Sequence, residues 1–342
     1  MTKLNIAIAG AGSAGTRLGE LLLTECGVEP WQLVFVRRGK VHNPYGDKRL
    51  TEALKGVRST SDICQAFRWA QAVIVANPTH LHTQTAQCAV RAGCHVLIEK
   101  PLGSVYDKDE PSRVSALQEE AHKRGLVVIV GYNLRFHEQA GLMRQWLPLV
   151  GSVRHAESET VEDVRTWHPW EDYKTSYAVC RALGGGVIAT QSHEVDLWYW
   201  LFGKPNMLTT RISVNKEFAP DVEVQARTKL LYPSFHIDHF VSYFGESKRT
   251  MRVEGSCGTL VWDLKAGVLE YKGDYQAPSQ KHTASSEGTR STSFVAELKH
   301  FLACIQGAAK PQNALPEAAE VFGILKSMYL SGQRSGVPIH IW

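Results

Sequence analysis

Three glycines near the start of the chain have the spacing of a phosphate-binding turn. The apolar residues 5–9 lead into Gly10, Gly12 and Gly15, a Gly-x-Gly-x-x-Gly pattern, and the residues that follow have helical spacing. Gly10 permits a tight turn, Gly12 lets the backbone approach a pyrophosphate, and Gly15 lets helix and strand pack closely. Because a helix N-terminus also offers N–H groups to an anion, we predict that a dinucleotide binds here. The residues assigned to this turn are Gly10, Gly12, Ser13, Ala14 and Gly15.

Two arginines after the next predicted strand bear on which dinucleotide would bind. Strand 32–36 is followed by Arg37 and Arg38, about twenty positions past the glycines, where a ribose-contacting residue belongs. An acidic residue there would accept hydrogen bonds from a ribose 2′-hydroxyl, whereas a guanidinium suits the extra phosphate of NADP. We therefore expect NADP(H), with NAD(H) as the alternative. In a second interpretation the glycine turn is only a tight connection, and the arginines with Lys40 form only a solvated strand end.

Two further predicted strands, 72–76 and 95–98, end in polar residues. Strands that alternate with helices form right-handed parallel crossovers, and ligands bind at the carboxyl ends of such strands. Lys100 follows an apolar strand and precedes Pro101, so we expect a lysine held in the cofactor crevice rather than a solvated charge. The residues assigned to the cofactor at these two strand ends are Asn77, Pro78, His82, Glu99 and Lys100.

The pattern of the chain changes near residue 131. Before it, strands alternate with helices, whereas from residue 152 the alternation of apolar and polar residues indicates antiparallel strands. We predict an α/β Rossmann dinucleotide-binding domain, 1–131, and an α+β domain with an open, mostly antiparallel sheet, 132–342. The polar segment 273–293 is expected to be a mobile surface excursion. Other predicted elements are helices 83–93, 105–123, 137–149, 294–305 and 317–329, and strands 126–130, 152–161, 208–216, 222–231, 235–244, 250–253, 258–264 and 337–339.

Composition narrows the functional class. The 342 residues are 44% hydrophobic and 21% charged, which is ordinary for a globular protein of two domains. The net charge is +4, and the basic residues are scattered, which argues against a nucleic-acid partner. Seven cysteines without a Cys-x-x-Cys pair indicate reduced thiols, and His80 and His82 have no partners at metal spacing, so no metal site is assigned. With no signal peptide and no apolar run long enough for a bilayer, a cytoplasmic protein without membrane partners is expected.

Taken together, the motifs resemble the Gfo/Idh/MocA family, the glucose-fructose oxidoreductase and inositol dehydrogenase group. The resemblance implies a Rossmann domain and a C-terminal sheet that forms an oligomer interface, here a homodimer or homotetramer. It also implies hydride transfer between NAD or NADP and a secondary hydroxyl or ketone of a sugar, sugar derivative or cyclitol. The segments that carry it are the glycine turn, Ala-Asn-Pro-Thr-His-Leu-His at 76–82, Glu-Lys-Pro at 99–101, Gly-Tyr-Asn-Leu-Arg-Phe at 131–136, Gly184–Gly186 with His193, Glu-Gly-Ser-Cys-Gly-Thr-Leu at 254–260, and Ser-Gly at 331–332.

The resemblance gives catalytic roles to two residues. Lys100 matches a lysine that contacts the nicotinamide ribose and the substrate, and a cation there can stabilise alkoxide character. His193 matches the acid/base histidine, and an imidazole is suited to take a hydroxyl proton near neutral pH. Many members carry an aspartate three or four residues earlier, but this chain has Ala189 and Thr190 there. The group that would orient His193 is therefore open.

The resemblance also suggests how substrate is held. The segment 167–173 is similar to a stretch in family members that act on sugars, and tryptophan faces stack on pyranose rings. An arginine can hold a carboxylate or phosphate, which would suit an anionic or nucleotide-linked sugar. Alternatively, the tryptophans only fix this insertion onto the domain. The residues assigned to the substrate are Arg135, Trp167, Trp170, Tyr173, Tyr177 and Asp196.

Two other functions remain open at this point. Some relatives use transient oxidation by a tightly bound nicotinamide to cleave a glycosidic or ether bond. Others share the architecture and only sense a dinucleotide as regulators. Because the chain retains both Lys100 and His193, we favour the sugar dehydrogenase or reductase.

Overall fold

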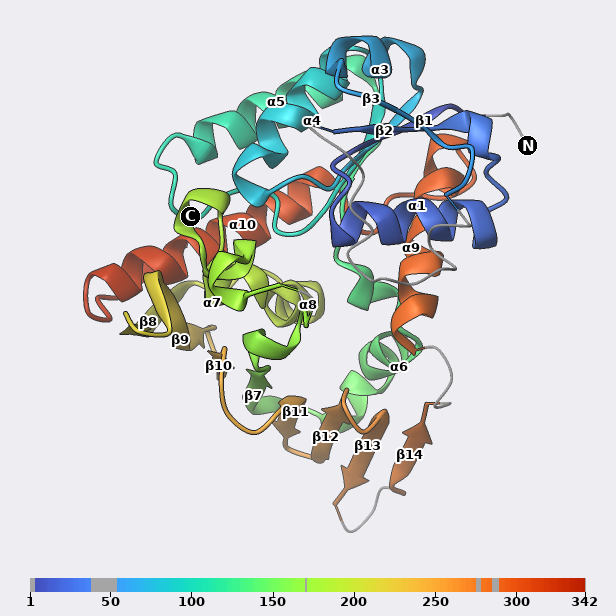
Figure 1. Ribbon diagram of the computed structural model, residues 1–342. Coiled ribbons are helices and arrows are strands. Elements are labelled where there is room, and N and C mark those ends of the chain that lie inside the picture. The colour runs from blue at the N-terminus through green and yellow to red at the C-terminus, as the bar shows by residue number, and fades with distance from the viewer. Residues whose placement is uncertain (1–3, 38–53, 170, 275–277, 285–288, 342) are drawn as a thin grey trace. The chain divides into compact units, whose positions relative to one another are not determined.

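The computed structural model describes residues 4–37, 54–169, 171–274, 278–284 and 289–341 (Figure 1). The chain forms two compact units: Met1–Asn133 with Phe294–Phe322, and Leu134–Ser293 with Gly323–Trp342. The predicted domains, 1–131 and 132–342, follow the order of the chain, whereas the first compact unit also includes a later segment. As functional domains they stay a prediction.

The first unit contains a six-stranded parallel sheet within the described residues. Its strand order, β3-β2-β1-β4-β5-β6, is that of a doubly wound dinucleotide-binding fold. Four of the strands are short and almost fully buried, as expected for a parallel sheet with helices on both faces. The predicted Rossmann fold is therefore confirmed. The strands are β1 (Ile6–Ala9), β2 (Leu33–Val36), β3 (Arg58–Thr60), β4 (Ala72–Val75), β5 (His95–Ile98) and β6 (Val128–Val130).

The helices of this unit cover the sheet. A buried cluster joins Leu18 and Leu22 of α1 to Ile8 of the sheet and to Leu298 and Phe301 of α9. Figure 1 shows α9 next to α1, although the two helices lie far apart in the sequence. The helices are α1 (Ser13–Glu25), α3 (Ile63–Trp69), α4 (His82–Arg91), α5 (Glu110–Arg124) and α9 (Thr289–Ile305), of which residues 294–305 belong to this unit.

Helix α5 begins later than the expected residue 105. Pro111 lies in its first turn, where the missing proline N–H costs nothing because the first N–H groups of a helix have no intrahelical acceptor. The same proline deeper in a helix would break it, so the helix cannot begin five residues earlier. Its end is as expected, since Gly125 takes the left-handed conformation.

The second unit contains a nine-stranded sheet in the described part of the chain, ordered β14-β13-β12-β11-β7-β10-β9-β8-β15. Its strand pairs are antiparallel except β7 and β10, which run parallel. The predicted mostly antiparallel sheet is confirmed. The strands are β7 (Val153–Val161), β8 (Met207–Asn215), β9 (Ala219–Leu231), β10 (His236–Ser242), β11 (Lys248–Gly255), β12 (Gly258–Asp263), β13 (Val268–Gly273), β14 (Gln280–Thr283) and β15 (Ile339–His340).

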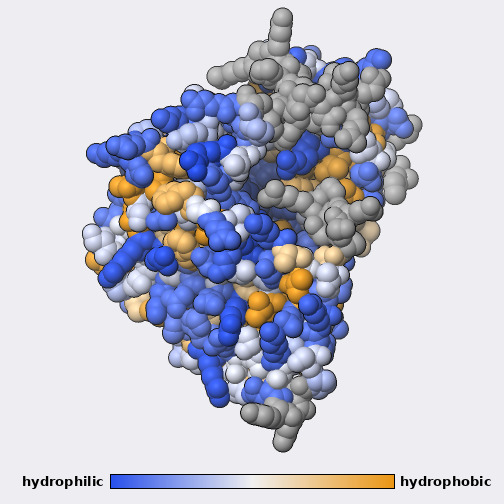
Figure 2. Space-filling view, turned by 60° about the horizontal axis from the view of Figure 1, so that its bottom comes forward, coloured by the Kyte–Doolittle hydropathy of each residue, from blue (hydrophilic) through white to orange (hydrophobic). Residues whose placement is uncertain are grey.

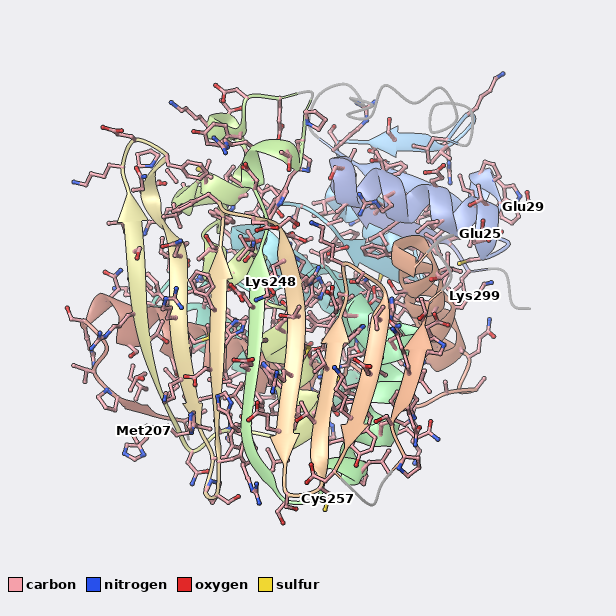
Figure 3. The ribbon with its side chains drawn as sticks, turned by 90° about the horizontal axis from the view of Figure 1, so that it is seen from below. Glu25, Glu29, Met207, Lys248, Cys257 and Lys299 are labelled. Atoms are coloured by element: carbon pink, nitrogen blue, oxygen red, sulfur yellow. The ribbon has the colours of Figure 1, made fainter. Side chains whose placement is uncertain are left out.

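Helices cover one face of this sheet. Trp262 of β12 donates to Gln139 of α6 over 2.9 Å, and Trp198 of α8 donates to Ser158 of β7 over 2.8 Å. The opposite face is open, and Figure 3 shows its side chains projecting from the strands. In Figure 2 hydrophilic residues predominate over the lower part of the view. The helices are α6 (Glu138–Trp146), α7 (Val187–Thr190), α8 (His193–Phe202) and the later part of α10 (Leu315–Gln333).

The expectation of a surface excursion at 273–293 is wrong for part of that segment. Residues 280–283 form β14, which pairs antiparallel with β13, and α9 begins at Thr289 rather than at Phe294. An edge strand pairs through its backbone and needs few apolar side chains, which is why a polar sequence can form one. Residues 275–277 and 285–288 lie outside the described residues.

Candidate functional site

The glycine turn after β1 is held so tightly that two of its positions require glycine. Gly10 has a φ of +117°, and a Cβ added there would lie 2.4 Å from the Ala76 carbonyl oxygen. A Cβ on Gly15 would lie 2.1 Å from the carbonyl oxygen of Gly10. The first glycine therefore lets the turn touch the end of β4, and the last lets α1 begin directly against the turn.

The first turn of α1 is accessible to a ligand. Gly12 is the N-cap residue, and a Cβ built on it would meet no described atom within 4 Å. Ser13 and Ala14 follow in the first turn, which contains no acidic residue, and no side chain in the described part of the chain caps it. The N-terminus of a helix carries a partial positive charge, so this end of α1 suits an anion.

The strand ends that the sequence singled out meet at one edge of the parallel sheet. The Ala76 N–H donates to the Ala9 carbonyl over 2.8 Å, and the Glu99 N–H donates to the Val75 carbonyl over 2.8 Å. The ladder thus continues beyond the strands, and the segments after β1, β4 and β5 leave side by side. Asn77, Pro78, Glu99 and Lys100 therefore share an edge with the glycine turn.

Asn77 and His82 fasten the connection after β4. Asn77 Nδ2 donates to Thr85 Oγ1 over 2.8 Å, while its buried Oδ1 has no hydrogen-bond partner among the described atoms. The buried His82 ring lies 2.8 Å from the carbonyl oxygens of both Asn77 and Pro101. Burial lowers the pKa of His82 to about 4, although the two carbonyls oppose that shift. The buried ring therefore lies between the segment after β4 and the segment after β5 and can donate to one of the two carbonyls when it is neutral.

Glu99 and Lys100 leave β5 together. Burial raises the pKa of Glu99, although the positive charges of Lys100 and Arg17 oppose the shift. The Lys100 N–H lies 3.3 Å from Glu99 Oε2. Lys100 is half-buried. Because only Glu99 separates it from the end of β5, the lysine stays close to this edge of the sheet.

Arg37 stands at the end of β2, on the same edge. Its guanidinium donates to Ser59 Oγ of β3 over 3.0 Å, and its backbone N–H donates to the Thr60 carbonyl over 3.0 Å. The side chain is half-buried and held by a neighbour that carries no charge. Arg38 lies outside the described residues.

In the second unit, His193 is the first residue of α8. It is the one residue from 187 to 198, all of them described, whose side chain is not buried. The preceding turn is set by Gly185, whose added Cβ would lie 2.3 Å from the Tyr177 carbonyl oxygen. The glycine run therefore packs the chain against the 3-10 helix Tyr177–Val179 and brings the histidine out at the head of α8.

The residues before and after His193 have other partners. Thr190 Oγ1 lies 2.9 Å from the Gly186 carbonyl and 2.7 Å from the buried Tyr243 hydroxyl. Glu194 is buried, and its Oε1 accepts from Arg249 Nε over 2.7 Å. Neither Thr190 nor Glu194 therefore takes the place of the aspartate that would orient His193, for which this chain has Ala189 or Thr190.

Arg135 and Asp196 face each other. Arg135 Nε and an Nη donate to the two carboxylate oxygens over 2.9 and 2.7 Å, and the two side chains are 0% and 1% exposed. Such a two-pronged pair satisfies the charge of each group inside the protein. Their assignment to substrate binding stays a prediction, since both are engaged here with one another.

The aromatic residues assigned to the substrate are held by other aromatic rings. Trp167 meets Tyr243 edge to face at 5.7 Å, and Tyr173 lies 5.2 Å from the ring of Phe218. Tyr177, half-buried, begins a 3-10 helix beside the glycine run. These contacts agree with the interpretation in which the insertion is fixed onto its domain. Trp170 lies outside the described residues.

Three residues that support these positions were missed in the sequence. Ser59 holds Arg37, Arg249 holds Glu194, and Tyr243 holds Thr190. Each lies on or beside a strand and has an ordinary type for its place, so only the fold reveals its partner. Among the described helices, none combines the length and the hydropathy that a membrane span requires.

Comparison with known proteins extends the picture. Residues 4–132 match the family model GFO_IDH_MocA, described as "Oxidoreductase family, NAD-binding Rossmann fold". A scyllo-inositol 2-dehydrogenase (NADP(+)) of Bacillus subtilis is 24% identical, covering 64% of this chain and 58% of its own. A 2,7-anhydro-N-acetylneuraminate hydratase of Mediterraneibacter gnavus is 25% identical, covering 59% and 50%. The chain thus spans less than two thirds of the length of these curated relatives.

Solved structures share the fold over nearly the whole chain. A levoglucosan dehydrogenase in complex with NADH superposes with a TM-score of 0.81 at 15% identity, covering 99% of both chains. An oxidoreductase from Agrobacterium radiobacter, in complex with NAD+, L-tartaric acid and magnesium, gives 0.80 at 17%, again over 99% of both. The Rossmann segment, residues 4–132, therefore matches the GFO_IDH_MocA oxidoreductase family, and nearly the whole chain shares its fold with solved oxidoreductases.

Proposed function

We propose that this chain is an NADP(H)-preferring oxidoreductase that moves hydride between the nicotinamide and a secondary hydroxyl or ketone of a sugar, sugar derivative or cyclitol. The observation that carries the proposal is His193: its side chain is partly exposed at the start of α8, while every other residue from 187 to 198 is buried. Packing of the core does not explain why one side chain in this buried stretch is partly exposed. An acid/base group needs that access to the substrate.

The residues of the first unit fit a dinucleotide. The close turn at Gly10, the open backbone at Gly12 and the first turn of α1 suit a pyrophosphate. Asn77 Oδ1 is a buried acceptor without a partner among the described atoms, so it is ready for a ligand donor. When bound, the nicotinamide supplies the hydride chemistry.

The chain's own residues supply charge and proton transfer. Lys100 places a cation at the edge of the parallel sheet that also holds the glycine turn. There it lowers the pKa of a substrate hydroxyl and stabilises alkoxide character. His193 takes the hydroxyl proton during oxidation and returns it during reduction. Thr190 and Glu194 have other partners, so the group that orients the imidazole is not the aspartate found in many relatives.

Arg37 supports the preference for NADP(H). Its guanidinium donates to Ser59 Oγ over 3.0 Å, which holds the side chain at the end of β2. A guanidinium at this strand end suits the extra phosphate on the adenosine ribose of NADP. Arg38 would add to the same charge.

The names of the relatives support a polyhydroxylated substrate. They include the inositol dehydrogenase, the levoglucosan dehydrogenase and a UDP-N-acetylglucosamine 3-dehydrogenase of Acidithiobacillus ferrooxidans, which is 34% identical over 26% of both chains. The last of these favours including nucleotide-linked and anionic sugars among the candidates. For this chain we keep Trp167, Trp170, Tyr173 and Tyr177 as the residues that would border the sugar.

A second function is favoured by one relative. The Mediterraneibacter gnavus protein is named a hydratase, a reaction without net oxidation. The same cofactor and the same Lys100 and His193 could serve bond cleavage in which the substrate is oxidised and reduced again in one cycle. Cofactor retained through purification, with product formed and no net change in nicotinamide absorbance, would identify this function.

We also propose that the chain forms a homodimer or homotetramer through the open face of the second unit's sheet. This face contains paired charges, including Lys248 with Glu159 and Arg252 with Glu254, and a hollow of about 630 Å³. Arg227 lies 3.9 Å above the ring of Phe240 beside it. A broad face of interspersed charges can pair with a copy of itself around a two-fold axis.

The test is a turnover screen with NADP+ and NADPH against sugars, cyclitols and sugar nucleotides. Lys100→Met should lower kcat by about 10²–10³-fold with cofactor binding partly kept, and His193→Ala should lower it by about 10²–10⁴-fold. His122→Ala, an exposed position of α5, is the matched control and should leave kcat unchanged. Unchanged turnover in Lys100→Met would exclude the proposed role, and dinucleotide binding without any turnover would favour a sensing regulator.

A further inference from the structure

Two histidines face each other in the middle of the second unit's sheet. His155 of β7 and His236 of β10 are direct partners in the parallel register, and their ring centroids lie 5.0 Å apart. Asp238 follows two residues after His236 and so points to the same face, which is the open one. Figure 3 shows β7 and β10 side by side in the sheet.

The three side chains converge on one point. The His155 Nε2 atom lies 3.0 Å from Asp238 Oδ2, and the His236 Nε2 atom lies 3.4 Å from the same oxygen. All three candidate ligand atoms lie within 4.8 Å of one another. In a tetrahedral complex with metal–ligand bonds of about 2.0–2.1 Å, ligand atoms are about 3.3–3.4 Å apart. The site therefore needs only small side-chain rotations to close around an ion.

The donor set selects the class of ion. Two imidazole nitrogens and one carboxylate oxygen suit zinc, cobalt or nickel, whereas calcium and magnesium prefer oxygen ligands throughout. We propose that His155, His236 and Asp238 bind one divalent transition-metal ion on the open face of this sheet. A fourth position would remain for water.

The surroundings support the site. Lys229 Nζ lies 3.5 Å from Asp238 Oδ1, the carboxylate oxygen that the histidines do not share, so it can orient the carboxylate from behind. In the single chain His155, His236 and Asp238 are 28%, 37% and 48% exposed, so an ion can reach all three ligands before the chain associates. Asp238 also borders the hollow on this face.

An ion pair alone is the competing explanation. Burial raises the pKa of Asp238, but the hydrogen bond from His155 and the charges of Lys229 and His236 outweigh it and leave the pKa below its usual value. A simple ion pair needs only one histidine, however, whereas here a second imidazole is directed at the same oxygen. Two imidazole nitrogens directed at one carboxylate oxygen instead bring three possible metal ligands together.

The expected consequence is a cross-link between the strands of the one parallel pair among the described pairs of this sheet. Because an ion that binds only the folded protein stabilises it, saturating zinc should raise the midpoint of thermal unfolding. This inference concerns the second unit alone and does not depend on the proposed oxidoreductase activity.

The test uses the full chain, without a histidine tag and freed of metal by a chelator. Cobalt titration should give the visible absorption of tetrahedral Co²⁺, and calorimetry with zinc should give one ion per chain. His155→Gln and His236→Gln should each weaken zinc binding by about tenfold or more, and the double variant should abolish it. His340→Gln, an exposed histidine of β15, is the matched control.

The outcomes are separable. Circular dichroism and the cofactor titration should show that the glutamine variants remain folded, because these side chains are partly exposed. One zinc per chain lost in both single variants and kept in His340→Gln supports the site. Absent zinc binding, or binding that survives the double variant, overturns it.

Discussion

In the first unit, the edge of the parallel sheet that includes the glycine turn is shaped by the backbone. In the second unit, the surroundings of His193 and α8 are held in a different way. The first is made by backbone: Gly10 and Gly15 stand where a Cβ would collide with a carbonyl. The second is made by side-chain pairs that join residues 61 and 55 positions apart, Arg135 with Asp196 and Glu194 with Arg249. A demand on the backbone leaves a local mark in the sequence, whereas a long-range pair does not. The backbone turn and the side-chain pairs can therefore be tested separately.

The largest effect is expected from the buried pair. Arg135→Ala should lower the free energy of unfolding by about 3–5 kcal/mol, because it leaves the Asp196 carboxylate buried without its partner. Chemical denaturation measures this difference. Replacing both residues by hydrophobic ones of similar volume should recover much of the loss.

The matched control is an exposed pair of the same unit. Arg165 pairs with Asp163 over 2.6 Å at the surface, so Arg165→Ala should change stability little. If Arg135→Ala instead keeps its stability and raises KM, Arg135 serves the substrate rather than the fold, and the contrast between the two constructions is lost.

The same contrast explains which parts of the site could be predicted. The glycine turn, the polar strand ends and Lys100 follow from spacing and strand periodicity, and the structure brings them to one edge. Arg135 and Asp196 were assigned to the substrate because each alone is a suitable ligand for a sugar or an anion. Nothing near either residue in the sequence indicates that they bond to each other.

Two secondary-structure predictions were wrong, each for a reason local to its segment. Helix α5 begins five residues after the predicted start, because Pro111 fits only in the first turn of the helix. The strand β14 was missed because its polar residues 280–283 pair through their backbone at the sheet edge. The fold of both regions was predicted, but the start of α5 and the presence of β14 were not.

Acid should weaken both units by a smaller amount. Burial lowers the pKa of His82 in the first unit and of His239 in the second to about 4, from 6.5. A depressed histidine pKa means that the unfolded chain binds more protons between those values, so stability is present above pH 6.5 and is lost as pH falls towards 4. Each histidine should contribute a loss of about 2 kcal/mol at pH 5.

Denaturation at pH 7 and pH 5 measures this loss. In His239→Gln the difference between the two pH values should shrink by about 2 kcal/mol. An unchanged pH dependence in His239→Gln would contradict the buried neutral ring. Ser158, which lies 2.8 Å from His239 Nδ1, can bond to the glutamine and keep the variant folded.

The smallest effect concerns the choice between cofactors. Arg37→Ala should weaken NADPH binding by about tenfold or more, since it removes a charge-assisted contact to a phosphate, and should leave NADH binding nearly unchanged. Ser59→Ala should give a smaller effect of the same sign, because Ser59 only holds the guanidinium. Equal weakening of both cofactors by Arg37→Ala would overturn the phosphate assignment.

The most direct test of the central claim is a fluorescence titration of the unaltered protein with NADPH and NADH, after any bound nucleotide has been removed. The account predicts saturable binding of a dinucleotide at the glycine turn, with NADPH bound about tenfold more tightly or better. Failure to bind either cofactor, or tighter binding of NADH, would contradict it.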